Sequence, residues 1–297
     1  MSQQLQSLNA ESALEKALDV HLSGTPERLA SSIRYSVMGP GKRVRPRLLL
    51  ACAKMISLNP EAAMAAAVAI ELIHCYTLIH DDLPCMDNDD FRRGRPSNHR
   101  QFDEATALLA GDSLIPLAFE SLLSAKAHVS SENVLAAIHR LAWAAGPRGV
   151  VAGQAEELEL KPDSTIDKLK DMHAKKTGAL FSASLLMPID LAGISEKSNE
   201  GRVIVQFAGE LGLAFQVADD IEDSKQDTAE EISGPGSGAT VSPRNILYYL
   251  PQNDARLLTL DSLSRAKKQL LSLWDTRAIP LVSIADEVAS KLAVDSL

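Results

Sequence analysis

Two groups of aspartates lie far apart in the chain, and each follows an apolar segment that predicts a helix. They are Asp81, Asp82 and Asp87 in the first group and Asp219, Asp220 and Asp223 in the second. Carboxylates this close together repel one another unless a cation lies among them. Mg²⁺ favours carboxylates together with substrate phosphates. A fold that brings both groups to face each other therefore predicts a metal-assisted diphosphate site.

The local spacing supports this interpretation. Asp219 and Asp223 are four residues apart and share a helix face, with Asp220 beside them. Pro84 cannot continue a regular helix, so a bend there could return Asp87 toward Asp81. A solvated acidic helix end explains one such cluster equally well, but two clusters favour a site.

The composition predicts an all-α fold. Hydrophobic residues make up 45% of the chain and aromatic residues only 4%. Ala and Leu, which are strong helix formers, abound, and alternating β-branched runs are scarce. The 297 residues contain no obvious linker, so we expect a single domain over residues 1–297.

Turn and cap signals divide the chain into expected helices. They cover residues 11–22, 27–38, 43–57, 61–83, 103–126, 131–146, 148–159, 197–223, 243–250, 254–275 and 279–294. Residues 88–98 and the Gly/Ser-rich stretch 233–238 are expected loops, and Ser164 is a plausible N-cap.

Charge and cysteine content exclude several classes of function. A formal net charge of −9 argues against nucleic acid as a partner. The three cysteines fit neither a disulfide framework nor a zinc site. Residues 1–6 lack a signal pattern, and the apolar stretch Met64–Ile73 is too short to cross a bilayer. These features predict a cytoplasmic protein without stable membrane insertion.

Basic residues lie where a diphosphate needs them. Lys42, Arg43 and Arg45 follow Gly41, and Lys42 and Arg45 are expected on one face of a helix whose N-terminus attracts anions. Arg92 and Arg93 follow the first acidic cluster, and Arg binds phosphate in a bidentate fork. The alternative for Arg92 and Arg93 is a salt-bridge patch that neutralises nearby aspartates.

Other polar residues are weaker candidates when taken singly. His74 lies two helical turns before Asp81 and could donate to a phosphate, although a histidine on an apolar helix is more often part of the core. Lys176 and Thr177 interrupt a helical stretch before Gly178. Gln216 lies three residues before Asp219 on nearly the same helix face.

Taken together, these motifs resemble the short-chain trans-isoprenyl diphosphate synthases. The resemblance covers about residues 30–225 and looks closest to bacterial farnesyl diphosphate synthases and plant-type geranylgeranyl synthases. The matching segments are Gly41-Lys42-Arg43-Val44-Arg45-Pro46, Leu78 to Asp90 with Arg92-Arg93-Gly94, Leu109-Ala110-Gly111-Asp112, Gly153-Gln154, Lys176 to Leu180 and Phe215 to Asp220.

The resemblance implies an isoprenoid-synthase-type helical bundle around a central cavity, working as a homodimer. Up to three Mg²⁺ ions, with Mn²⁺ as a possible substitute, would be held by Asp81, Asp82, Asp87 and Asp219, helped by Asp220 and Asp223. Isopentenyl diphosphate would bind to Lys42, Arg45, His74 and Arg93, and the allylic diphosphate to Arg92, Lys176, Thr177 and Gln216. The reaction would be ionisation, condensation and proton loss, giving isoprenyl diphosphates from smaller ones.

Product length is expected to depend on Tyr76, which lies five residues before Asp81, roughly 7.5 Å along a helix. A bulky aromatic there resembles the pocket floor of farnesyl synthases and predicts a C15 product. The segment Pro84 to Asp90 resembles geranylgeranyl synthases instead, so C20 is the alternative.

The resemblance weakens after Asp223. The family usually has Leu in place of Glu222 and two lysines farther on, for which Lys225 or Arg244 could substitute. Glu222, Glu230 and Glu231 also make this stretch more acidic. A non-catalytic subunit of a prenyl synthase is therefore kept as an alternative. A terpene cyclase of similar fold is a separate alternative, against which Lys42, Arg45 and the low aromatic content argue.

Overall fold

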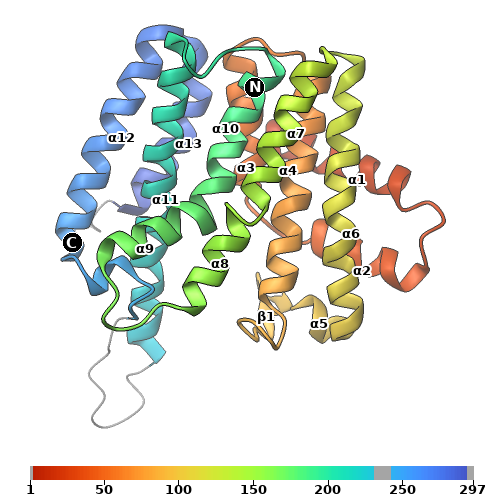
Figure 1. Cartoon of the computed structure of the whole chain (residues 1–297), viewed down its shortest axis with the longest axis horizontal. Coiled ribbons are helices and arrows are strands. Elements are labelled where there is room, and N and C mark those ends of the chain that lie inside the picture. Colours follow the sequence, from red (N-terminus) through yellow and green to blue (C-terminus); the bar gives the residue numbers. More distant parts are fainter. Residues whose placement is uncertain (1–2, 231–241, 293–297) are drawn as a thin grey trace. The chain divides into compact units, whose positions relative to one another are not determined.

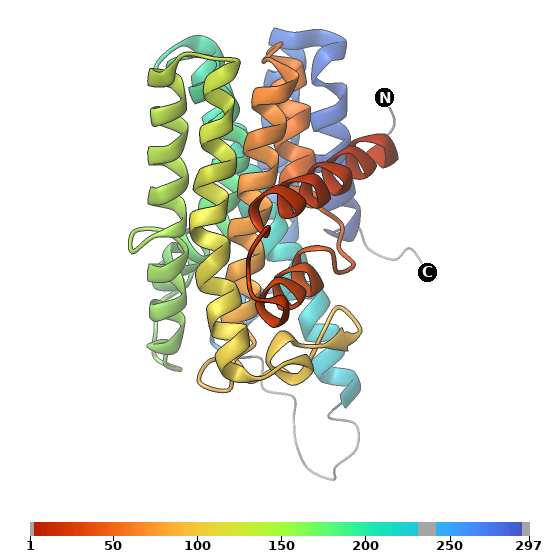
Figure 2. The same ribbon diagram turned by 90° about the vertical axis from the view of Figure 1, so that its right-hand side faces the viewer.

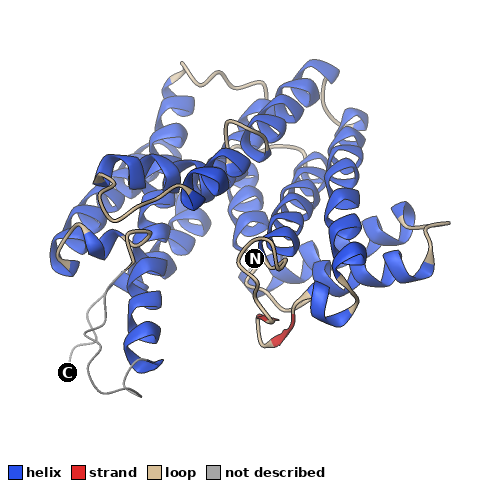
Figure 3. Cartoon of the chain, turned by 60° about the horizontal axis from the view of Figure 1, so that its bottom comes forward, coloured by secondary structure: helices blue, strands red, loops and turns tan. Residues whose placement is uncertain are grey.

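The chain folds into α-helices with a single short hairpin among the residues described by the computed structural model, which are 3–230 and 242–292 (Figures 1 and 3). The all-α prediction is confirmed. The chain divides into two compact units. The first comprises Met1–Leu141 and Met187–Gly193, and the second Ala142–Leu186 and Ile194–Leu297. The expectation of one domain stays a prediction.

The first unit is a helical layer with a hairpin at one end. Its elements are α1 (Gln3–His21), α2 (Glu27–Val37), α3 (Val44–Met55), α4 (Pro60–Asp81), β1 (Phe91–Arg92), β2 (Arg95–Pro96), α5 (Asn98–Gln101), α6 (Glu104–Leu123), η1 (Ser124–Ala127) and most of α7 (Ser131–Ala145). Helix α1 crosses α3 and α4 obliquely (Figure 2).

Helix α4 is the core of this unit. Asn59 caps it by accepting hydrogen bonds from the backbone N–H groups of Glu61 and Ala62, both at 3.0 Å. Pro60 fills the first helical position, where an N–H group has no intrahelical partner to lose. Most α4 residues are buried, and α3 and α6 pack against it. It thereby presents its C-terminal end, with the first aspartates, to the hairpin side.

The apolar stretch in α4 is longer than we expected from the sequence. Pro60–Asp81 has a mean hydropathy of 1.8, enough for a membrane span by length and composition, and Glu104–Ala127 reaches 1.3. However, 78% of the α4 window is buried inside the protein, as in the core helix of a soluble protein. The absence of membrane insertion stays a prediction.

The second unit is built around one long helix. Its elements are α8 (Val150–Leu158), α9 (Ile166–His173), the single π-helical turn η2 (Ala174–Gly178), most of α10 (Ala179–Leu191), α11 (Asn199–Glu230), η4 (Ile246–Tyr248), α12 (Gln252–Trp274), η5 (Asp275–Ala278) and α13 (Ile279–Leu292). Helices α12 and α13 pack along α11.

Three local predictions were wrong. Helix α11 continues past Asp223 to Glu230, so the second acidic cluster lies within a helix and does not end one. The expected helix 243–250 is only the short turn η4. Thr165, which accepts a bond from the Lys168 N–H at 3.3 Å, caps α9 in place of Ser164. The stretch 233–238 lies outside the described residues.

Candidate active site

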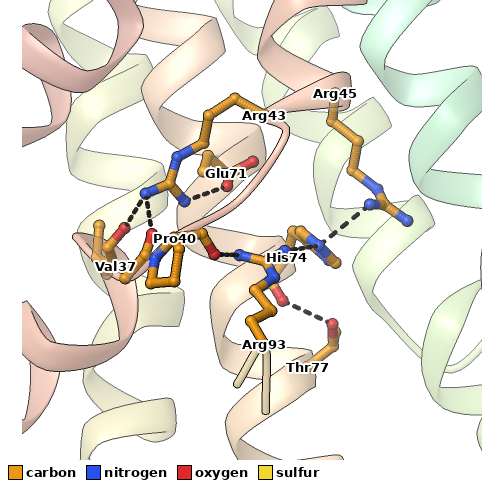
Figure 4. Close-up of polar contacts among 9 residues, drawn as sticks. Val37, Pro40, Arg43, Arg45, Glu71, His74, Thr77 and Arg93 are labelled. Carbon is orange, nitrogen blue, oxygen red and sulfur yellow. Dashed lines mark hydrogen bonds and ion pairs between the residues drawn. The ribbon is translucent and has the colours of Figure 1, made fainter. Parts of the chain in front are cut away.

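A buried ion pair shapes the loop before α3. Arg43 donates to Glu71 Oε1 at 2.7 Å, and both side chains are only 1% exposed (Figure 4). It also donates to the carbonyl oxygens of Val37 at 2.6 Å and Gly39 at 2.8 Å. Burial alone would lower the Arg43 pKa, but the charge of Glu71 and its hydrogen bond to Arg43, with smaller contributions from other acidic groups, together raise it. Arg43 thus ties this loop to α4 and stays charged.

Arg43 also decides where Lys42 lies. Its backbone is left-handed, with φ of 47°, and α3 begins only at Val44. Lys42 is therefore exposed and outside the helix. The prediction that Lys42 and Arg45 share a helical face was wrong, because the chain turns at Arg43 to reach Glu71.

Three predicted residues of the isopentenyl site come together around His74. The Nε2 atom of His74 lies 3.2 Å from Arg45 Nη1 and 3.5 Å from Arg93 Nη2 (Figure 4). Arg93 also donates to the carbonyl oxygen of Pro40 at 3.0 Å. We call Arg45, His74 and Arg93 the His74 cluster. Arg45 belongs to α3 and Arg93 to the turn of the hairpin, and both guanidinium groups lie against His74 of α4.

The proton position on His74 follows from this geometry. Guanidinium groups only donate hydrogen bonds, so Nε2 must accept them and His74 must be neutral. Burial, followed by the charges of Arg45 and Arg93, lowers the pKa of His74 well below its ordinary value. His74 therefore positions two arginines, whereas the sequence suggested that it donates to a phosphate itself.

The first acidic cluster divides into an inner and an outer part. Asp82 is buried and accepts a hydrogen bond from Arg92 Nε at 2.8 Å, with a second contact to Arg92 Nη2. Arg92 also bonds Asp89 at 2.8 Å. Burial raises the pKa of Asp82, and the Arg92 hydrogen bond offsets part of that rise. The salt-bridge alternative for Arg92 is thus the arrangement in the structure.

The outer part is the turn after α4. The backbone N–H of Asp87 donates to the Asp81 carbonyl oxygen at 2.9 Å, and Asn88 has a positive φ of 56°. This confirms the predicted bend that returns Asp87 toward Asp81. Asp81 is half-buried and Asp87 is exposed, so their carboxylates are the more accessible ones in this cluster.

Tyr76 lies one helical turn before His80 on α4. Tyr76 is 7% exposed, and its ring packs edge-on to that of His80 with centroids 5.7 Å apart. Burial, with the charge of Asp81, raises the pKa of Tyr76 to about 12. Gly111 of α6 allows this packing, because a Cβ atom there would lie 2.1 Å from His80 Nε2. The Leu109–Asp112 motif therefore serves close helix packing beside Tyr76.

In the second unit, Lys176 is held by a partner that we did not expect. Its ammonium group bonds Glu157 of α8. A Cβ atom on Gly153 would lie 2.2 Å from the Lys176 backbone nitrogen, so only glycine lets α8 approach the π-helical turn this closely. Thr177 lies in the same turn and is half-buried.

Gln154 is a further candidate that the sequence motif contained but that we gave no role. It is 8% exposed, and within the described residues neither its Oε1 nor its Nε2 has a hydrogen-bond partner. A buried amide without partners is costly. A bound substrate or water is the simplest way to satisfy it.

Asp220 faces inward from α11. Its Oδ1 accepts from Gln216 Nε2 at 2.7 Å and its Oδ2 from the Ile246 N–H at 2.7 Å. Asn245 also donates to the Asp220 carbonyl oxygen at 2.7 Å. Both predicted residues, Asp220 and Gln216, are thus engaged with each other, and Asp220 pins the chain as it returns at η4.

Asp219 faces a different partner, Lys291 of α13. The Lys291 ammonium lies 3.6 Å from Asp219 Oδ1 and 2.8 Å from Glu222 Oε2. Burial lowers the Lys291 pKa, but the Glu222 hydrogen bond and the charge of Asp219 raise it overall. Sequence reasoning missed Lys291, and the side chains of Asp223 and Lys225 lie outside the described residues.

These carboxylates fit a hard metal ion whose other ligands are water and the oxygens of a diphosphate. In the described part of the chain, no three His, Cys, Asp or Glu side chains form a ready metal site. Of the aspartates predicted to hold metal ions, Asp81, Asp87 and Asp219 are more exposed than Asp82 and Asp220. Mg²⁺ commonly binds one or two carboxylates and takes its other ligands from water and substrate phosphates, and Mn²⁺ suits the same oxygen ligands.

The described residues thus combine a helical fold, acidic clusters on α4 and α11, and two arginines that share one histidine nitrogen. The sequence matches the family description "Polyprenyl synthetase" over residues 26–235. The chain belongs to this family and is a prenyl chain-elongation transferase.

Individual relatives extend the likeness beyond the motifs. A chloroplastic geranylgeranyl pyrophosphate synthase from Capsicum annuum is 37% identical over 284 residues, covering 95% of this chain and 76% of the relative. A dimethylallyltranstransferase from Fischerella ambigua is 36% identical, covering 95% and 80%. An FPP/GFPP synthase structure from Zymomonas mobilis has a TM-score of 0.80 at 32% identity, covering 97% and 100%. The likeness thus runs well past residue 225, where the motifs end.

Proposed function

We propose that this chain condenses isopentenyl diphosphate head-to-tail with dimethylallyl or geranyl diphosphate, in a Mg²⁺-dependent reaction whose main product is farnesyl diphosphate. The His74 cluster carries this proposal. It offers two guanidinium groups to an anion, apart from the carboxylates that suit a metal ion. A cyclase uses one diphosphate substrate and needs no second anion site.

The residues of the first unit would bind isopentenyl diphosphate. Arg45 and Arg93 are already oriented by His74, and Arg93 is also fixed by the Pro40 carbonyl. Preorganised cations lose little freedom when they bind an anion. Lys42 is exposed on the adjoining loop and adds a third positive charge.

The allylic diphosphate would bind to Arg92, Lys176, Thr177 and Gln216. Bound Mg²⁺ supplies stabilisation of the negative charge on the leaving diphosphate. The allylic C–O bond breaks and its electrons remain with the diphosphate. The double bond of isopentenyl diphosphate then forms the new C–C bond, and the departing diphosphate takes the proton that is lost. No protein nucleophile is required, which agrees with the absence of any chemical role for Cys85.

Product length is proposed from Tyr76. Its buried ring lies on α4 before Asp81, and a bulky floor there would stop growth at C15. C20 is the second candidate, because relatives named geranylgeranyl pyrophosphate synthase match 95% of this chain. Tyr76→Ala should lengthen the product by at least one C5 unit.

We also propose that the protein is a cytoplasmic homodimer. Helix α6 exposes Leu108 at 46%, Leu109 at 54% and Leu123 at 43%, an apolar surface that a second copy could cover. Light scattering on the purified protein tests the assembly: a monomer at micromolar concentration would contradict it.

Product analysis by mass spectrometry tests the activity. Purified protein is incubated with Mg²⁺, isopentenyl diphosphate and either dimethylallyl or geranyl diphosphate, beside the Tyr76→Ala variant. A C15 product that becomes longer in the variant supports the proposal. A C20 product from the wild type would keep the condensation and remove the Tyr76 argument. If the folded protein gives no product, the role of a non-catalytic subunit replaces the enzyme.

A further inference from the structure

Lys291 crosses from α13 to one stripe of α11. Phe215, Asp219 and Glu222 lie at positions i, i+4 and i+7, so they share a helix face. The Lys291 ammonium lies 2.8 Å from Glu222, 3.6 Å from Asp219 and 5.9 Å from the Phe215 ring centroid. The side chain is 32% exposed, so it is confined by its neighbours but retains access to solvent.

The ammonium group has two acidic neighbours of unequal distance. Its contact with Glu222 is a hydrogen bond, whereas its distance to Asp219 is that of a looser ion pair. Lys has a compact charge on a flexible stem, so small rotations can move the ammonium between the two carboxylates. Glu222 thus holds the ammonium back from Asp219.

A metal ion bound by Asp219 would meet this ammonium at close range. Two cations near one carboxylate oppose each other, since like charges at a few ångströms repel. The ammonium must therefore withdraw when the metal binds, and Glu222 is already in place to keep it. In the metal-free protein the same ammonium offsets the repulsion between Asp219 and Glu222.

We propose that Lys291 is an internal counter-ion that competes with the metal ion at Asp219, and that Glu222 weakens this competition by holding the ammonium away. This inference rests on the Mg²⁺ dependence of the proposed function and on the predicted role of Asp219 as a ligand of that metal ion. It gives roles to Glu222, which departs from the family pattern, and to a lysine from the far end of the chain.

The affinity for Mn²⁺ alone tests the proposal without an activity assay. Binding is measured as the loss of the EPR signal of free Mn²⁺. Lys291→Met should bind Mn²⁺ roughly two- to five-fold more tightly, the range expected for a partly exposed ion pair. Lys291→Arg keeps the charge and should stay within about two-fold of the wild type. Lys267→Met is the matched control, because it removes a lysine that pairs with Asp286 at 2.6 Å in the same unit.

A double-mutant cycle with Glu222→Gln tests the role of Glu222. The single substitution Glu222→Gln should weaken Mn²⁺ binding, because the ammonium loses its hydrogen-bond partner and is freed toward Asp219, and because one attractive charge is lost. In the Lys291→Met background only the charge effect remains, so the loss should be smaller. An equal loss in both backgrounds would overturn the role given to Glu222.

The outcomes separate this inference from the function beneath it. Asp219→Asn should reduce Mn²⁺ binding, and if it does not, the metal site itself is wrong. If Asp219→Asn reduces binding but Lys291→Met leaves it unchanged or weakens it, the competition is wrong and the metal site stands. A shift of equal size in Lys267→Met would assign the effect to net charge and overturn the proposal.

Discussion

The two units hold their cationic groups in opposite ways. In the first unit the cations are arginines with fixed partners: Arg43 is 1% exposed on Glu71, and Arg45 and Arg93 share the His74 nitrogen. In the second unit the cations at the candidate site are lysines: Lys176 is 25% exposed and pairs with Glu157, and Lys291 is 32% exposed and pairs with Glu222 and Asp219. The arginines of the first unit are thus held rigidly, whereas the lysines of the second unit can change position.

This difference follows from the chemistry of the two side chains. A guanidinium group is planar, always charged and bonds several acceptors in fixed directions, whereas an ammonium group is a mobile point charge. A rigid arginine site suits an anion that only has to be held. Lysines that rest on Glu157 or Glu222 can instead move when a metal ion and a diphosphate arrive.

The largest effect is expected from the buried pair in the first unit. Arg43→Met leaves Glu71 charged and buried, which should lower the free energy of unfolding by about 3–5 kcal/mol. Lys176→Met in the second unit removes a partly exposed pair and should cost about 0–1 kcal/mol. Urea unfolding of both variants measures the contrast.

A second variant separates the buried charge from simple loss of packing. Arg43→Met with Glu71→Leu removes both charges and should regain part of the stability lost in the single variant. If Arg43→Met and Lys176→Met destabilise the protein equally, the first unit is no more rigidly built than the second.

The sequence predicted most of the helices and charged residues of the two units but not the distant residues with which the charged side chains pair. Helical periodicity placed most helices within a few residues, and the spacing around Pro84 predicted the return of Asp87. Lys42 was misplaced because Arg43 turns away from the helix to reach Glu71, 28 residues later. Residues 243–250 were predicted as a helix, but Asp220 accepts the Ile246 N–H from 26 residues away and shortens it. Local propensity carries no information on such distant partners.

A middle-sized effect is expected where α8 meets the π-helical turn. Gly153→Ala places a Cβ atom 2.2 Å from the Lys176 backbone nitrogen, which cannot move independently of its turn. Overpacking of this kind should cost about 1–3 kcal/mol. It should also raise the KM for the allylic substrate more than that for isopentenyl diphosphate, because Lys176 is proposed to bind the allylic diphosphate.

Gly209→Ala in α11 is the matched control. Among the described residues a Cβ atom there meets nothing within 4 Å, so the substitution should stabilise the helix by up to about 1 kcal/mol. Thermal unfolding of the two variants should therefore give shifts of opposite sign. Equal shifts would show that the approach at Gly153 is loose and that Lys176 is not positioned by it.

The smallest effect concerns acid stability, because within the described residues each unit has one histidine whose pKa is lowered, His74 in the first and His173 in the second. Burial and two arginines lower the pKa of His74, and burial lowers that of His173 to about 4, partly offset by its bond to the Arg244 carbonyl. A depressed histidine pKa means that the unfolded chain binds more protons than the folded one below pH 6.5. Stability from both residues is therefore complete above about pH 6.5 and is lost as the pH falls.

His74→Gln removes this titration but keeps an acceptor for the two arginines. Its melting temperature should fall less between pH 6.5 and pH 5 than that of the wild type. Because protonation of the folded His74 also sets three cations against one another, the KM for isopentenyl diphosphate should rise in the wild type only as the pH approaches the lowered pKa of His74, and it should rise less in the variant. His173→Gln should reduce the pH dependence of the melting temperature but leave the pH dependence of that KM unchanged. If both variants change the KM profile alike, the effect of pH belongs to global stability, and His74 has no special part in holding Arg45 and Arg93.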